Sequence, residues 1–98
     1  MRNFISEIDI IADNKEYIIF VEVKTRTSSE LYPPRASVNA EKRRKIISAS
    51  KAYLKHKNIS KNIRYDIAEV YLSKDKYKVE SINYIENAFY DRRRYASF

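Results

Sequence analysis

Three acidic side chains and one lysine occur in two strand-like runs near the start of the chain. Glu7 and Asp9 lie in the first run, and Glu22 and Lys24 lie in the second. Clustered carboxylates repel one another unless a cation lies among them, and such oxygen ligands suit a hard ion such as Mg²⁺. A lysine beside them could position a water or stabilise charge on a phosphate. These residue types favour metal-assisted hydrolysis of a phosphodiester, provided that the side chains meet.

The turn between the two runs decides whether they meet. Side chains two residues apart on a strand share a face, and opposed residues of an antiparallel pair point the same way. A two-residue turn would pair Glu7 with Glu22, and a four-residue turn would pair Asp9 with Glu22; either gathers all four side chains on one face. A three-residue turn without a bulge would separate them. Glu22 and Lys24 would then be an ordinary charge pair on a solvent-facing strand.

Two segments carry a resemblance to a known family. Residues 6–12 read Ser-Glu-Ile-Asp-Ile-Ile-Ala, and residues 19–26 read Ile-Phe-Val-Glu-Val-Lys-Thr-Arg. Together they resemble the YraN-like family, an uncharacterised bacterial group of the restriction-endonuclease-like nuclease superfamily, which is also similar to archaeal Holliday junction resolvases. The resemblance continues through residues 40–54, 64–67 and 85–89, so that it covers most of the chain.

The resemblance implies a fold, a cofactor and roles for the site residues. The fold would be an α/β restriction-endonuclease-like core, whose mixed sheet contains an antiparallel hairpin and a crossover helix. Asp9, Glu22 and the carbonyl of Val23 would bind Mg²⁺ or Mn²⁺. Lys24 would be the catalytic lysine, and Glu7 a flanking acid.

The chain departs from the family pattern at its start. Ser6 stands where the family usually has glycine, and family members usually begin with a helix that carries another acidic residue. Here residues 1–4 lead almost directly into the first strand. We therefore expect the leading helix to be missing, which would leave the site and the cover of the sheet incomplete. A homodimer is one way to cover such a gap.

Composition bounds the other possibilities. A chain of 98 residues makes one domain, expected over residues 1–90. The absence of cysteine and glycine excludes disulfides, thiolate zinc sites and glycine-rich phosphate loops, and a lone histidine, His56, argues against a histidine metal site. The sequence has no signal-peptide pattern and no apolar run that could span a bilayer, so a cytoplasmic protein without a membrane partner is expected.

Positive charge points to a polyanionic partner. The net charge is +7 and the pI is near 9.6. A helix capped by Asn39 and running to about His56 would bury a stripe that includes Ile46 and Ile47 and present a basic outer face. The expected nucleic-acid contacts are Arg26, Lys42, Arg43, Arg44 and Lys45. A merely solvated face, or the composition of an AT-rich genome, would account for the same lysines and arginines.

The remaining elements frame this helix. A proline-containing loop follows Arg26, and strands are expected over residues 64–72 and 77–85 with a turn at 73–76. Residues 85–89 would close the fold, and residues 91–98 form a basic tail. Asp66 falls on the Ala68 side of its strand, where a strand-start or capping role is expected, outside the site.

The sequence thus predicts a metal-dependent DNA endonuclease, acting on branched or single-stranded DNA. One alternative is a catalytically inactive nucleic-acid-binding module of the same fold. A small structural or assembly protein is the third.

Overall fold

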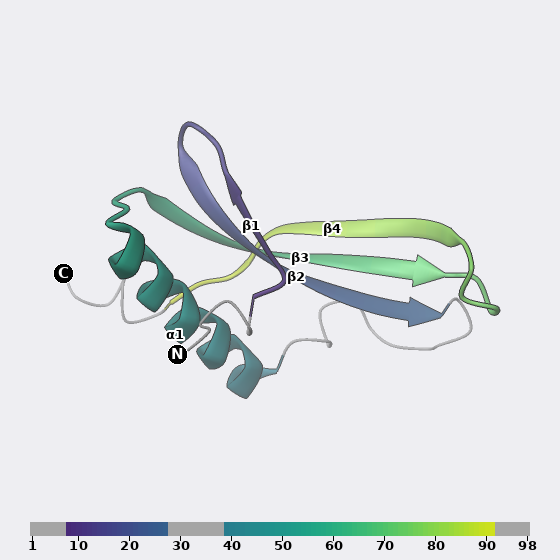
Figure 1. Cartoon of the computed structure of the whole chain (residues 1–98). Helices are drawn as coiled ribbons and strands as arrows, with labels where there is room; N and C mark the ends of the chain where they lie inside the picture. The colour runs from purple at the N-terminus through teal and green to yellow at the C-terminus, as the bar shows by residue number, and fades with distance from the viewer. Residues whose placement is uncertain (1–7, 28–38, 92–98) are drawn as a thin grey trace.

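The described part of the chain forms a four-stranded mixed sheet with one helix against it (Figure 1). A computed structural model describes residues 8–27 and 39–91. The elements in chain order are β1 (Ile10–Asp13), β2 (Tyr17–Thr27), α1 (Ala40–Lys57), β3 (Asn62–Leu72) and β4 (Val79–Phe89). Neighbouring strands follow the order β1-β2-β3-β4; only the β2–β3 pair is parallel. The predicted mixed sheet, hairpin and crossover helix are therefore confirmed.

Asn14 fixes the register of the first hairpin. Its side-chain oxygen accepts hydrogen bonds from the backbone N–H groups of Glu16, at 2.9 Å, and Tyr17, at 2.7 Å. Asparagine commonly closes turns in this way. Asp13 then pairs with Ile18, which leaves a four-residue turn. This is one of the two turn lengths that bring the acidic side chains to one face.

Asparagines cap both ends of helix α1. The side chain of Asn39 accepts a hydrogen bond from the N–H of Lys42 at 2.8 Å, which confirms the predicted N-cap. Asn58 ends the helix in the left-handed region, with φ of 55°, a conformation that asparagine tolerates. The predicted inner stripe is also confirmed. Its buried members are Ile46, Ile47, Ala49 and Ser50, and Tyr53 and Leu54 pack at its margin.

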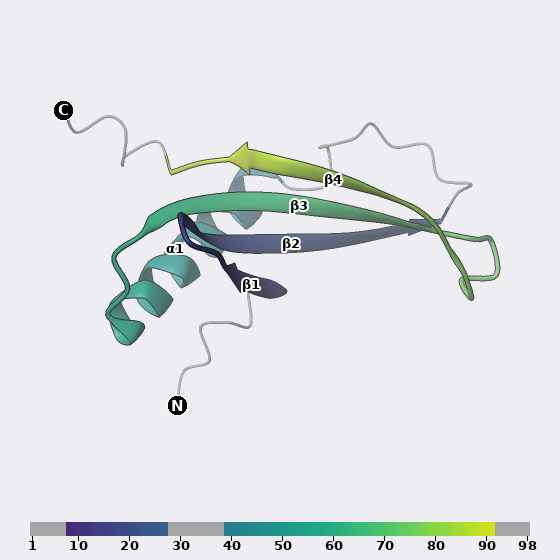
Figure 2. The ribbon, with the colours of Figure 1, turned by 90° about the horizontal axis from the view of Figure 1, so that it is seen from above.

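The core lies between α1 and one face of the sheet, which we call the inner face (Figure 2). Phe20 on β2 stacks on Tyr65 of β3 with ring centroids 5.8 Å apart, and Tyr65 stacks on Phe89 of β4 at 5.1 Å. Tyr53 of α1 meets Phe20 edge-on at 6.1 Å, and Ser50 is hydrogen-bonded to the Tyr65 hydroxyl at 2.6 Å. The helix covers only part of this face. The far ends of β2 and β3 extend beyond it (Figure 1).

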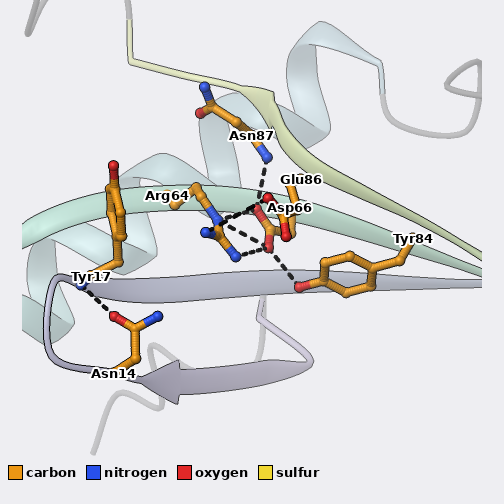
Figure 3. A network of polar contacts seen from close by, with 7 residues as sticks. All are labelled: Asn14, Tyr17, Arg64, Asp66, Tyr84, Glu86 and Asn87. Atoms are coloured by element: carbon orange, nitrogen blue, oxygen red, sulfur yellow. Dashed lines mark hydrogen bonds and ion pairs between the residues drawn. The ribbon is translucent and has the colours of Figure 1, made fainter.

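A buried polar network joins β3 to β4 on the opposite, outer face (Figure 3). The carboxylate of Asp66 is fully buried and accepts hydrogen bonds from Arg64, from the Tyr84 hydroxyl at 2.6 Å and from the Asn87 N–H at 2.8 Å. Burial alone would raise the pKa of Asp66, but these hydrogen bonds, led by that from Arg64, lower it below its usual value. Burial, helped by the hydrogen bond to the Asp66 carboxylate, raises the pKa of Tyr84 to about 12. Asp66 thus links two strands, and the expected strand-start or capping role is too narrow.

Element boundaries differ from the predictions mainly at β4. A register shift between Tyr71 and Leu72 aligns Val79 with Leu72, and the strand continues to Phe89. The segment expected to close the fold is therefore the second half of β4. Glu7, the loop over residues 28–38 and residues 92–98 of the predicted tail lie outside the described residues. Asp91, at the start of that tail, is buried and ion-paired with Lys51.

Candidate metal and nucleic-acid site

Asp9 and Glu22 meet at the open end of the β1–β2 hairpin. Ile10 pairs with Val21, so continuing the register by one residue sets Asp9 opposite Glu22. Their carboxyl groups share a hydrogen bond, and the Asp9 Oδ2 atom accepts another, of 2.8 Å, from the N–H of Val23. The structure therefore unites the two residues predicted to bind metal. That backbone bond fixes the Asp9 side chain beside the strand.

Glu22 is an acid held in an environment that disfavours its charge. The residue is only 5% exposed, and its Oε2 atom accepts no hydrogen bond from a described residue. Burial raises the pKa of Glu22 from the usual 4.5 to about 7, helped by the hydrogen bond and the repulsion from Asp9. Lys42 and Lys24 oppose the rise in pKa. A buried carboxylate that lacks a full set of partners is stabilised by a proton or by a cation.

The residues after Glu22 offer the other predicted groups. Lys24 lies two residues along β2, on the same face, and its charge acts on Glu22. Val23 directs its N–H to Asp9 at the edge of the strand. The N–H and C=O of one strand residue point to the same side, so the Val23 carbonyl also points toward this edge. Asp9, Glu22 and Lys24 therefore gather as the sequence predicts, beside the Val23 carbonyl that the resemblance implies as a ligand.

Lys42 is a site residue whose role sequence reasoning missed. It lies in the first turn of α1, and its Nζ atom is 3.8 Å from the Glu22 Oε2 atom. The sequence predicts Lys42 as a nucleic-acid contact, because it begins a run of four basic residues. The N-cap at Asn39 fixes the helix start and so sets which of these side chains faces the sheet. The loop before the helix hid this relationship, because its length gives no register.

Glu69 is a second buried acid close to the site. It lies directly opposite Lys24 in the parallel β2–β3 pair, is fully buried, and accepts a hydrogen bond from the Asn83 side chain at 2.8 Å. Alternation along β3 places Glu69 on the same face as Tyr65 and Ile67, and this pattern could have predicted that Glu69 is buried. An acid on a core-facing strand position needs a partner.

The other residues predicted to contact nucleic acid lie in different environments. Arg26 is half-buried two residues beyond Lys24 on β2. Lys45 forms an ion pair with Glu41 at 3.8 Å, one turn away on α1. Arg43 and Arg44 are exposed and border a groove on the side of α1 that adjoins the end of β4. The basic cluster is thus not one uniform patch.

The donor atoms fit a hard divalent cation. Mg²⁺ commonly takes one or two carboxylates and keeps several waters, and Asp9, Glu22 and the Val23 carbonyl supply such a set. The Glu22 Oε2 atom, without a hydrogen bond from residues 8–27 or 39–91, is the observation that favours this fit. Over those same residues, no cluster of three or more acidic, histidine or cysteine side chains suited to a metal occurs. Among the described residues, the site therefore presents a pair of carboxylates.

Fold and site together define a small α/β domain with an acid pair and two lysines at the open end of a hairpin. The family model that matches the chain, over residues 1–70, is that of the uncharacterised protein family UPF0102. The chain belongs to this family. Within the described ranges, no helix is both long and apolar enough to cross a membrane.

Bacterial relatives match along most of the chain. A UPF0102 protein of Caldanaerobacter subterraneus is 44% identical over 92 residues, which span 90% of this chain and 75% of that protein. A relative from Clostridium acetobutylicum is 45% identical over 91 residues, spanning 90% of this chain and 72% of the relative. One from Clostridioides difficile is 44% identical over 86 residues, spanning 87% and 71%. Their names assign no activity.

Proposed function

We propose that this protein is a Mg²⁺-dependent endonuclease that hydrolyses phosphodiesters of branched or single-stranded DNA, built on a restriction-endonuclease-like core. The observation that carries the proposal is the buried Glu22 carboxylate, pressed against Asp9 and flanked by Lys24 and Lys42. Such an arrangement is costly unless a cation or a proton completes it. Catalytic sites commonly hold groups with pKa values displaced in this way.

Each residue would have a separate task. Asp9, oriented by the Val23 N–H, and Glu22 would hold the cation together with the Val23 carbonyl. The bound metal would supply a Lewis acid and an activated water at neutral pH. Lys24, on the same face of β2, would orient the attacking water and offset the charge that develops on the phosphate. The positive charge of the chain would draw the DNA toward this face.

Cleavage of labelled DNA tests this proposal. Four-way-junction, flapped, single-stranded and linear substrates would be compared in Mg²⁺, Mn²⁺ and EDTA, with Asp9→Ala and Lys24→Ala variants in parallel. We expect metal-dependent cutting that both substitutions abolish. Asp13→Ala is the matched control, because Asp13 lies on the same hairpin but pairs with Lys61. Cutting that survives both site substitutions would assign the activity to a contaminant and reject the site.

An inactive nucleic-acid-binding module is the second candidate. The observation that favours it is that the described site contains a pair of acids and no larger acidic cluster. This module would bind DNA with strong salt dependence, would need no metal and would cut none of the substrates. A cytoplasmic location and a homodimer remain predictions from the sequence.

A further inference from the structure

A groove separate from the acid pair lies between the first turns of α1 and the end of β4. Its volume is about 680 Å³. The helix side is formed by Ala40, Arg43, Arg44, Ile47 and Ser48, and the strand side by Ala88, Phe89, Tyr90 and Asp91. None of these residues belongs to the Asp9–Glu22 site. The groove and the site share only the first turn of α1, from which Lys42 extends toward Glu22.

Two arginines of the groove, Arg43 and Arg44, form no ion pair with any described residue. Lys42, Lys45 and Lys51 on the same helix each form an ion pair with an acidic residue. Arg43 and Arg44 are exposed, and neither forms an ion pair with another residue in the described part of the chain. Lys51 also offsets Asp91, the one acid among the described residues that line the groove. An anion would therefore meet little opposing charge here, and the nearby N-terminal end of the helix adds to the attraction.

The other wall of the groove is aromatic and apolar. Tyr90 is 53% exposed, which is high for a large side chain next to a core. Phe89, the preceding residue on the same wall, is buried and stacks on Tyr65. Ile47 and Ala88 complete the apolar surface. An exposed aromatic ring beside apolar side chains is suited to stacking against a flat partner.

A nucleotide combines the two chemistries that the groove offers. Its phosphate matches a guanidinium group, which binds phosphate oxygens with two parallel hydrogen bonds. Its base is planar and largely apolar on both faces, so it can stack on an aromatic ring when it is not paired. A duplex would present phosphates alone, because its bases are stacked inside. An acidic peptide would offer carboxylates to the arginines, but it has no planar group in each residue that could stack on the exposed ring.

We propose that this groove binds one nucleotide of an unpaired nucleic-acid strand, with Arg43 and Arg44 on the phosphate and Tyr90 against the base. The choice of partner rests on the proposed function, and the groove adds where the strand is held and which strand form is preferred. Lys42 and Arg43 are neighbours that serve the site and the groove from one turn of α1. A strand held in the groove would pass this turn on its way to Asp9 and Glu22.

Binding of labelled oligonucleotides in EDTA tests the groove without requiring cleavage. Fluorescence anisotropy would compare a single strand of mixed sequence with its duplex. We expect Arg43→Gln with Arg44→Gln to weaken single-strand binding by roughly tenfold or more, and to lower the slope of log K against log salt by about 1.4. Lys55→Gln with Lys57→Gln is the matched control, because it removes two exposed charges from the far end of the same helix. This control should change the affinity about twofold or less.

The aromatic wall is tested separately. We expect Tyr90→Ala to weaken single-strand binding by roughly fivefold or more and duplex binding very little, while Tyr90→Phe retains the affinity. Equal losses in the two double variants would show that only net charge matters and would overturn the groove. So would a Tyr90→Ala variant with unchanged single-strand affinity, or a wild-type protein that binds no single strand. Circular dichroism spectra and thermal unfolding would confirm that each variant is folded.

The groove and the nuclease can fail independently. If no substrate is cut but Arg43, Arg44 and Tyr90 govern single-strand binding, the groove stands and the nuclease proposal fails. If Asp9→Ala abolishes cutting but the groove variants bind normally, the groove fails alone.

Discussion

Lys42, in the first turn of α1, lies 3.8 Å from the Glu22 carboxylate of β2. This contact is the point at which the helix and the acid pair meet. It means that the position of α1 on the sheet affects the charge state of the site. Lys42 contributes to the site from a separate element, whereas Asp9 and Glu22 come from one hairpin.

The first prediction concerns this lysine. Removing its charge by Lys42→Met should raise the pKa of Glu22 above about 7, because Lys42 is one of the two cations that lower it. Carboxyl ¹³C chemical shifts followed through a pH titration would measure the change. Lys45→Met is the control, because Lys45 pairs with Glu41. An unchanged pKa of Glu22 in Lys42→Met would show that the ion pair has no influence in solution.

The second prediction concerns stability in the absence of metal. The folded-state pKa of Glu22, about 7, lies above its usual 4.5. The fold therefore prefers the protonated acid, and stability is lost as the pH rises from about 4.5 through about 7. Glu22→Gln should be more stable than the wild type by about 1–3 kcal/mol at pH 8, and the difference should vanish near pH 4. Urea unfolding in EDTA measures it, with the exposed Glu16→Gln as control. A variant of wild-type stability at pH 8 would contradict the burial argument.

The third prediction concerns metal binding. Mg²⁺ should raise the melting temperature more at pH 8 than at pH 6, because a proton on Glu22 competes with the cation. At tenfold the dissociation constant the stabilisation would be about 1.4 kcal/mol, or several degrees for a domain of this size. Asp9→Asn should remove the effect, whereas Asp13→Asn should keep it. A shift that is independent of pH would point to a site elsewhere.

The sequence predicted the acid pair because two local features determine it. Alternation along a strand sets Glu22 and Lys24 on one face, and Asn14 closes a turn whose length was one of the options. The part played by Lys42 could not be predicted, because it depends on how a helix beyond a long loop is set on the sheet. The proximity of Glu69 to the site could not be predicted for a similar reason. Its position opposite Lys24 follows from a parallel pairing between segments that are distant in the sequence.

The fourth prediction concerns Asp66. Asp66→Ala should reduce the free energy of unfolding by about 3–5 kcal/mol, because Arg64 loses its nearer carboxylate partner and the Tyr84 hydroxyl and Asn87 N–H lose their acceptor. Tyr84→Phe should cost only about 1–2 kcal/mol, since it removes a single hydrogen bond. Urea denaturation at pH 7 would compare them. A loss below about 1 kcal/mol for Asp66→Ala would show that the network contributes little.

The fifth prediction concerns the turn between β3 and β4. Lys76 has a φ of 66°, in the left-handed region that disfavours residues other than glycine. Lys76→Gly should therefore stabilise the fold by about 0.5–1 kcal/mol. Lys74→Gly in the same turn should not, because Lys74 has no positive φ to relieve. Thermal unfolding of the two variants gives the comparison, and equal effects would refute the assignment of strain to Lys76.

Strand β2 joins a short-range pairing with β1 to a long-range pairing with β3. Contacts that are close in sequence form quickly, whereas a parallel pair must wait for its crossover to close. The hairpin would therefore bring Asp9 and Glu22 together early, before α1 delivers Lys42. During folding, the two acids would therefore repel each other before Lys42, the main opposing charge, reaches them. Acidic conditions or a divalent cation would then speed the search for the native state, an effect that stopped-flow refolding would detect.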